Sequence, residues 1–121
     1  MNKFCILLTC CVSPEYCNER EIVKRKKLYL KVIKKWLKST EFDIYCVDSS
    51  GYKFPEIENK RFHSYSFLYK NKDPHVGKSN GECKSILEAY KYFKRDLKKY
   101  KFIIKITGRY FLEDLEKWTQ R

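Results

Sequence analysis

Several residues and patterns are scarce in this 121-residue chain, and the missing patterns narrow what it can be. Glycine and proline occur only four and three times, and Ala89 is the single alanine. No two cysteines form a C-x-x-C pair, which argues against a zinc ribbon or a thioredoxin-type site. No apolar run approaches the ~18 residues of a membrane span, so the sequence predicts a soluble protein without a transmembrane segment.

The chain is strongly basic. It holds 27 Lys and Arg against 15 Asp and Glu, for a formal net charge of +12. Such a charge predicts a polyanionic partner, such as a nucleotide, a nucleic acid or an acidic membrane surface. Lysine outnumbers arginine, however, and Asn, Ile, Tyr and Phe are plentiful, as in proteins encoded by AT-rich genomes. A polyanion-binding groove and a coding bias that also favours solubility both remain open.

Strand and helix patterns alternate along the chain without repeats or a linker, so we expect one domain over residues 1–121. Apolar, β-rich runs predict buried parallel strands at 3–9, 42–48 and 100–106, with a further strand at 61–67. Between them we expect a long helix from Ser13 and a second helix from about Ser79. The predicted fold class is α/β: a Rossmann-like open, mostly parallel sheet flanked by helices.

Each expected helix has an apolar stripe that should face the sheet. The first stripe comprises Ile22, Tyr29, Val32, Ile33, Trp36 and Leu37, and the second comprises Cys83, Ile86, Leu87, Tyr90 and Leu97. Ser13, Pro14 and Glu15 are typical of a helix start, and Ser79 with Glu82 has capping-box spacing. Residues 111–121 fit either a strand start or a short helix.

The six cysteines form no metal-binding pattern. Several of them lie in apolar runs, which predicts buried free thiols in a reducing compartment and therefore a cytoplasmic protein. The six are Cys5, Cys10, Cys11, Cys17, Cys46 and Cys83. His63 and His75 lack a partner at metal spacing, so we do not expect them to bind a metal.

Ligands of open parallel sheets gather at the carboxyl ends of the strands. Here those ends are Thr9–Ser13, Asp48–Gly51 and Thr107–Tyr110. Asp48 could accept hydrogen bonds from a nucleoside, although Asp-Ser-Ser-Gly would also form an Asx turn. Arg109 follows Gly108, which lets the chain turn sharply. We expect its guanidinium to pair with a diphosphate, the alternative being a surface arginine at a turn.

The stretch HVGKS at 75–79 ends like a P-loop, but Lys72 occupies the position of the first glycine and Pro74 stiffens the loop. We therefore do not predict a Walker-type site. Lys78 could still meet an anion, because a helix amino terminus beside it would offer free amides. Glu82 could cap that helix, or it could orient Lys78 or a ligand hydroxyl.

Four segments together resemble the nucleotide-sugar-binding half of GT-A glycosyltransferases: CILLTCCVSP, CVDSSGY, GKSNGECKSILEAY and FIIKITGRYF. The likeness is to bacterial and giant-virus sugar transferases with a K-G-x-G-E helix start and a K-x-T-G-R-Y strand end, which makes a virus-encoded protein one expectation. The resemblance implies a nucleotide-diphosphosugar donor and an acceptor glycan, lipid or protein. The implied donor-binding residues are Thr9, Asp48, Lys78, Gly81, Glu82, Thr107, Gly108, Arg109 and Tyr110.

Two departures from that family matter. Many GT-A enzymes bind Mn or Mg through an Asp-x-Asp motif, which KITGRY lacks, so Arg109 and lysines would have to offset the diphosphate charge. The chain also stops soon after its fourth apolar strand, so we expect a truncated transferase, without an identified catalytic base. Two alternatives stay open: an inactive remnant, and a small basic nucleic-acid-binding module that uses the lysines of the first helix.

Overall fold

A computed structural model describes residues 3–70 and 78–120, with only the main chain described for 78–80. The elements in chain order are β1 (Phe4–Cys10), α1 (Glu19–Ser39), β2 (Asp43–Asp48), β3 (Phe62–Ser66), α2 (Lys78–Tyr92), α3 (Lys94–Leu97), β4 (Phe102–Thr107) and α4 (Leu115–Thr119). The four predicted strands are all present. Residues 111–121 contain a short helix rather than a strand.

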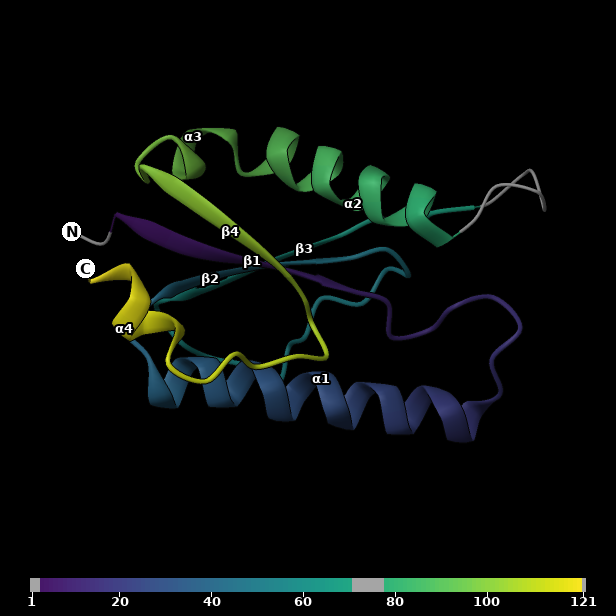
Figure 1. Cartoon of the computed structure of the whole chain (residues 1–121). Coiled ribbons are helices and arrows are strands. Elements are labelled where there is room, and N and C mark those ends of the chain that lie inside the picture. The colour runs from purple at the N-terminus through teal and green to yellow at the C-terminus, as the bar shows by residue number, and fades with distance from the viewer. Residues whose placement is uncertain (1–2, 71–77, 121) are drawn as a thin grey trace.

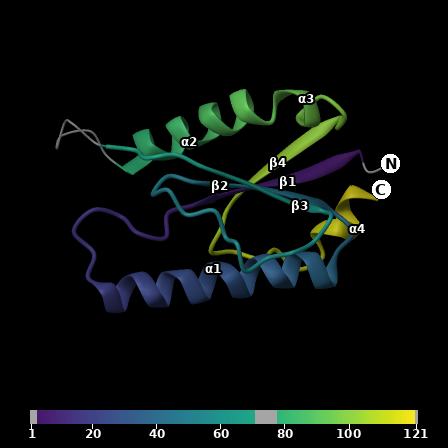
Figure 2. The same ribbon diagram turned by 180° about the vertical axis from the view of Figure 1, so that it is seen from behind.

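The four strands form one parallel sheet in the order β3-β2-β1-β4, with β1 at the centre (Figure 1). Helix α1 covers one face, and α2 with α3 covers the other, as the view from behind also shows (Figure 2). The predicted α/β class, with an open Rossmann-like sheet between helices, is therefore confirmed. The strand order reverses between β1 and β4, which is where such sheets bind ligands.

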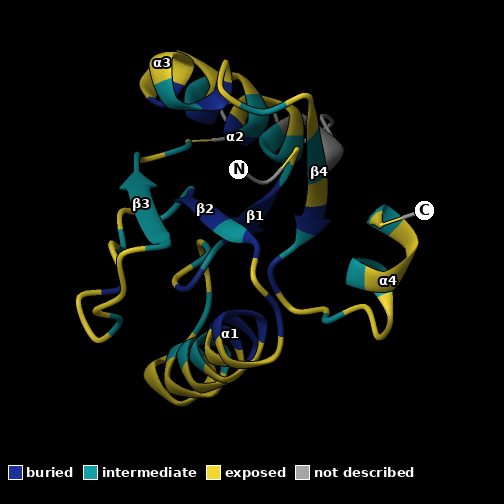
Figure 3. Ribbon diagram, turned by 90° about the vertical axis from the view of Figure 1, so that its left-hand side faces the viewer, coloured by how far each residue is buried: buried dark blue, intermediate teal, exposed yellow. Residues whose placement is uncertain are grey.

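The core has one layer on each face of the sheet. Alternate residues of β1 point to opposite faces, so Ile6 and Leu8 pack towards α1 while Cys5 and Leu7 pack towards α2. Every residue of β1 from Cys5 to Cys10 is buried, as expected for a central parallel strand. The burial colours of Figure 3 show the buried centre between helices whose outer sides are exposed.

Two sequence-based expectations are wrong: the start of the first helix and the burial of the last strand. Helix α1 begins at Glu19, not near Pro14, because the Asn18 side chain accepts a hydrogen bond from the Glu21 amide and so caps the helix. Strand β4 was expected to be buried but lies at an edge of the sheet, where Ile106 alone among its six residues is buried. The stripe of α1 is confirmed, since Tyr29, Val32, Ile33, Trp36 and Leu37 are buried.

The stripe predicted for α2 is largely wrong. Leu97 is buried, but the residues of α2 that face the sheet are Ser85 and Ala89, followed by Phe93 just after the helix. Leu87 and Tyr90 are 58% and 53% exposed, and Cys83 is exposed as well. Small side chains on the inner side let the helix lie close to the sheet, and this leaves the larger apolar side chains outside.

All six thiols are free, and Cys5, Cys10 and Cys46 are buried as predicted, whereas Cys83 is exposed. Burial raises the pKa of Cys5 to about 12, with Asp43 adding to the shift. Burial also raises the pKa of Cys10 well above its usual value, helped by the hydrogen bond with Cys46. Reactive thiolate is therefore suppressed at these two positions.

We expect Ellman's reagent to modify Cys83 first in the native protein, because this thiol is exposed. Cys5, Cys10 and Cys46 should react only after unfolding, since burial blocks access to them. Absorbance at mildly alkaline pH with and without denaturant measures both phases. Cys83→Ser should remove the fastest phase and leave a slower native-state reaction of Cys11 and Cys17, which are partly buried; an unchanged fastest phase in this variant would contradict the burial pattern.

Candidate ligand site at the carboxyl edge of the sheet

The segments after β1 and β4 meet at the carboxyl edge of the sheet. The Gly108 amide donates a hydrogen bond of 2.8 Å to the Thr9 carbonyl, which extends the pairing of the two strands by one residue. A Cβ at Gly108 would overlap the Cys10 sulfur and would lie 3.0 Å from the Thr9 carbonyl oxygen. The expected turn is present, closed by a hydrogen bond of 3.0 Å from the Tyr110 amide to the Thr107 carbonyl, but Gly108 has no positive φ, so close packing is what requires a glycine there.

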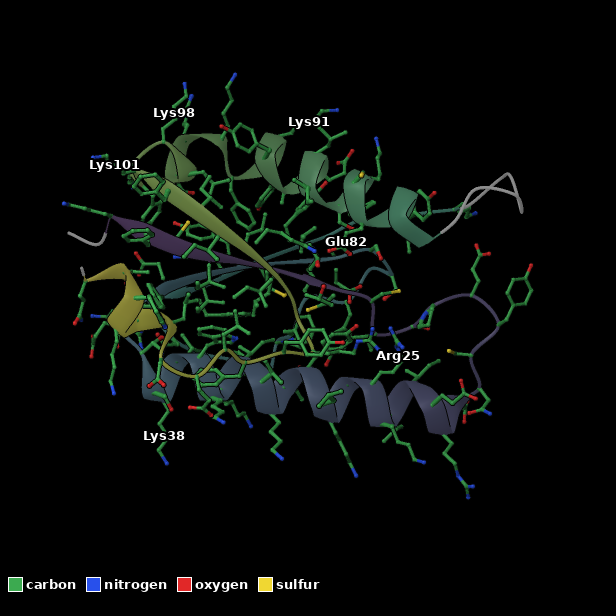
Figure 4. All side chains as sticks on the ribbon, in the orientation of Figure 1. Arg25, Lys38, Glu82, Lys91, Lys98 and Lys101 are labelled. Atoms are coloured by element: carbon green, nitrogen blue, oxygen red, sulfur yellow. The ribbon has the colours of Figure 1, made fainter. Side chains whose placement is uncertain are left out.

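A polar cluster joins α2 to β1 and β4 on the other face of this edge. The Thr9 hydroxyl donates a hydrogen bond of 2.6 Å to Glu82 Oε1, and Lys105 forms an ion pair with the same oxygen. Lys105 Nζ also lies 3.5 Å from the Thr107 hydroxyl. Figure 4 shows Glu82 directed from α2 towards the strands. The Glu82 carboxylate therefore connects α2 to β1 and β4 at this edge.

Asp48, the expected nucleoside contact, is fully buried. Its Oδ2 accepts a hydrogen bond of 2.9 Å from the Val12 amide, and its Oδ1 accepts bonds from the Ser50 amide and hydroxyl and from the Tyr52 amide. The bond from the Val12 amide ties the loop after β1 to the loop after β2, while the other three lie within residues 48–52. The bond from the Ser50 amide is the one that the Asx-turn alternative predicted. In this arrangement the carboxylate holds the site together and is not free for a ribose.

Arg25 on α1 is a further residue of this edge, and sequence reasoning missed it. Its Nε donates a hydrogen bond of 2.8 Å to the Cys11 carbonyl, and its Nη2 lies 3.2 Å from the Tyr29 hydroxyl. Burial raises the pKa of Tyr29, which keeps this hydroxyl neutral. Within the described residues Arg25 has no acidic partner at ion-pair distance. The sequence did contain a clue to this role: Arg25 lies four residues before Tyr29 and so on the same side of the helix. A cation on the buried side of a helix requires a hydrogen-bond partner.

The main-chain amides of the loop after β1 are already used. Those of Cys11, Val12 and Ser13 donate to Tyr29, Asp48 and Ser50 respectively, at 2.9 to 3.2 Å. An anion at this edge therefore cannot rely on these amides as it would in a glycine-rich phosphate loop. Side-chain cations would have to bind it instead, and Arg25 and Arg109 are the arginines available there.

The expected site residues are only partly brought together. Thr9, Glu82, Thr107 and Gly108 are linked through the contacts described above. Arg109 and Tyr110 are exposed at the turn that follows β4. Gly81 lies in the first turns of α2 with Tyr69 beside it. The side chains of Lys78 and Ser79, and the whole of the HVG stretch with Lys72, Pro74 and His75, lie outside the described residues.

Other surface features lie away from this edge. A hollow of about 300 Å³ is lined by α1 and residues 56–59. A second hollow, of about 430 Å³, is lined by residues at the start of β1, before β2 and in or just after α4. No group of three or more His, Cys, Asp or Glu side chains suited to a metal ion occurs in the described part of the chain. None of the helices described here combines the length and apolarity needed to cross a bilayer.

Comparisons with protein-family models, with curated proteins and with solved structures found no match to this chain.

Proposed function

We propose that this chain binds a nucleotide-diphosphosugar at the carboxyl edge of its sheet, as the donor-binding part of a GT-A-type glycosyltransferase. One observation carries the proposal: Glu82 of the G-K-x-x-G-E segment and Lys105 of the K-x-T-G-R-Y segment form an ion pair, although they are 23 positions apart in the chain. The two segments that resemble the family therefore lie beside one another in the folded protein, which supports a shared donor site.

The charges of the site suit the proposed ligand. Arg25 and Arg109 have no acidic partner at ion-pair distance among the described residues, so both can offset charge that develops on a departing nucleoside diphosphate. Glu82 and Lys105 neutralise one another, and we assign them to hydrogen bonds with sugar hydroxyls rather than to the diphosphate. An acceptor hydroxyl, from a glycan, lipid or protein, would attack the anomeric carbon. We name no catalytic base.

Thermal-shift measurements with UDP, GDP, CDP and their sugars, with and without manganese, test the proposal. At a hundredfold excess over its Kd, the correct nucleotide stabilises the protein by about 2.7 kcal/mol. For a domain of this size that raises Tm by roughly 10 °C. Arg109→Ala should weaken nucleotide affinity at least tenfold and so reduce the ligand-induced rise in Tm. The Tm of the unliganded protein should be unchanged, because this side chain is exposed.

Arg20→Ala is the matched control, since Arg20 is also an exposed arginine and lies in the first turn of α1. Arg25→Lys keeps a cation but loses the paired donors, so it should also weaken binding. The absence of a shift with every nucleotide would refute the proposal. Equal losses in the Arg20 and Arg109 variants would show that net charge, and not this site, binds the nucleotide.

The nucleic-acid alternative rests on the outer side of α1, where Lys24, Lys27, Lys31, Lys34 and Lys38 are exposed. A row of cations along one helix can follow a phosphate backbone. Duplex and single-stranded oligonucleotides in the same thermal-shift screen separate the two functions. Stabilisation by oligonucleotides alone, with a steep dependence on salt, would replace the nucleotide-sugar proposal.

A further inference from the structure

Helix α2 has apolar side chains on both of its sides. The inner side packs on the sheet through Ser85 and Ala89. The outer side carries Cys83, Leu87 and Tyr90, which are spaced four and three residues apart and so form one stripe on the surface of the helix. All three are exposed, Leu87 to 58% and Tyr90 to 53%. An exposed apolar stripe of this kind indicates a partner surface.

Cations lie beside this stripe on α2 and continue beyond its carboxyl end along α3. Residues 84–101 contain seven Lys and Arg but only two acids, and Glu88 and Asp96 are paired with Lys84 and Lys99. The other five cations have no acidic partner at ion-pair distance in the described part of the chain, and all are exposed. They are Lys91, Lys94, Arg95, Lys98 and Lys101. Figure 4 shows Lys91 and Lys98 pointing away from the sheet.

We propose that this surface, the outer side of α2 and α3 with Lys101, binds the surface of an anionic lipid bilayer. Lysines on a helix that lies in the plane of a bilayer reach lipid phosphates with their charged ends while Leu and Tyr enter the acyl boundary. Leu87 favours a bilayer over a nucleic acid as the partner. An aliphatic side chain gains free energy when it enters an apolar interior, but it cannot stack on nucleic-acid bases. The surface therefore fits a membrane better than a nucleic acid.

The position of the surface relative to the candidate ligand site is consistent with a lipid-borne partner. The amino end of α2 lies at the carboxyl edge of the sheet, where Glu82 contacts Thr9, while α3 lies towards the opposite edge (Figure 1). A bilayer lying along α2 would therefore run beside the ligand edge without covering the loops after β1 and β4, which lie on the other face. The inference is independent of the nucleotide-sugar proposal, because it rests on different residues.

Vesicle co-sedimentation of the full chain tests the inference. We expect binding to phosphatidylcholine vesicles that contain phosphatidylserine, and little binding to phosphatidylcholine alone. Each cation near an anionic surface contributes roughly a fivefold gain in partitioning, so K91Q/K94Q/K98Q should bind about a hundredfold more weakly. Leu87→Asn should cost about tenfold, because it removes one inserted side chain.

The variant K24Q/K27Q/K31Q is the matched control, since it removes the same charge from α1 on the opposite face of the sheet. It should bind vesicles nearly as well as the unmodified chain. Bound vesicles should also slow the reaction of Cys83 with Ellman's reagent, because this thiol lies in the apolar stripe.

Four results would overturn the inference. They are no binding to anionic vesicles, equal losses in the two triple variants, an unchanged affinity in Leu87→Asn, and binding of this surface to an oligonucleotide but not to vesicles. A failed nucleotide screen would leave the inference standing, because that screen probes the other site. Circular dichroism of each variant verifies the fold, which these exposed substitutions should not alter.

Discussion

Gly108→Ala is expected to lower the free energy of unfolding by about 3 kcal/mol, the upper end of the cost of overpacking a filled site. The added Cβ would overlap the Cys10 sulfur and would lie 3.0 Å from the Thr9 carbonyl oxygen and 3.1 Å from Tyr29 Cδ1. The Thr9 carbonyl cannot move away without weakening its hydrogen bond with the Gly108 amide, and the hydroxyl of the Tyr29 ring is held by the Cys11 amide and by Arg25. Urea denaturation with a two-state fit measures the loss.

Gly81→Ala is the matched control for this substitution. A Cβ there would lie 3.3 Å from Cε1 of the Tyr69 ring, and Gly81 is inside a helix, where alanine is favoured by about 1 kcal/mol. The stability of the Gly81→Ala variant should be unchanged or slightly higher.

In a Cys10→Ala background the cost of Gly108→Ala should fall by about 1 kcal/mol or more, because one of the overlapping atoms is gone. Purely additive effects would contradict the packing argument.

Asp48→Ala is expected to destabilise the protein by about 3 to 5 kcal/mol. The substitution leaves the amides of Val12, Ser50 and Tyr52 without their acceptor, at a position that is fully buried. Asp48→Asn keeps the shape but replaces one acceptor oxygen with a donor, so it should cost about 2 kcal/mol. Denaturant titration measures both values. Asp96→Asn, which affects only an exposed pair with Lys99, should change stability by about 1 kcal/mol or less.

Asp48→Asn also separates a structural role of this carboxylate from a role in nucleotide binding. If Asp48 only joins the two loops, the folded variant should keep most of the nucleotide-induced rise in Tm. A folded variant that loses this rise entirely would show that the carboxylate contacts the ribose, as the sequence suggested, and that the loops open when the ligand binds. The comparison is made under conditions where circular dichroism shows the variant to be folded.

The sequence by itself determined most of the secondary-structure elements and the edge of the sheet that they share at their carboxyl ends. Apolar runs such as FDIYCVD and the stripe from Tyr29 to Leu37 are local patterns, and a strand or a helix follows from them directly. The carboxyl ends of parallel strands meet at one edge, so Thr9, Asp48 and Thr107 were expected at the same edge; the pairing of Thr9 with Thr107 came only from the structure. Boundaries were less certain, because Ser13 and Asn18 are both good helix caps.

Only the tertiary structure decided which side of α2 faces the sheet, because both sides carry apolar residues and the choice depends on how closely Ala89 and Ser85 allow the helix to approach. The tertiary structure also decided that the Asp48 carboxylate accepts hydrogen bonds from the loops after β1 and β2, and that Arg25 donates to the Cys11 carbonyl. The bonds from Val12 to Asp48 and from Arg25 to Cys11 join segments distant in sequence, whereas the Ser50 bond of the Asx turn is local. Hydrogen bonding and close packing depend on distances between such segments, and the local patterns of a sequence do not contain those distances.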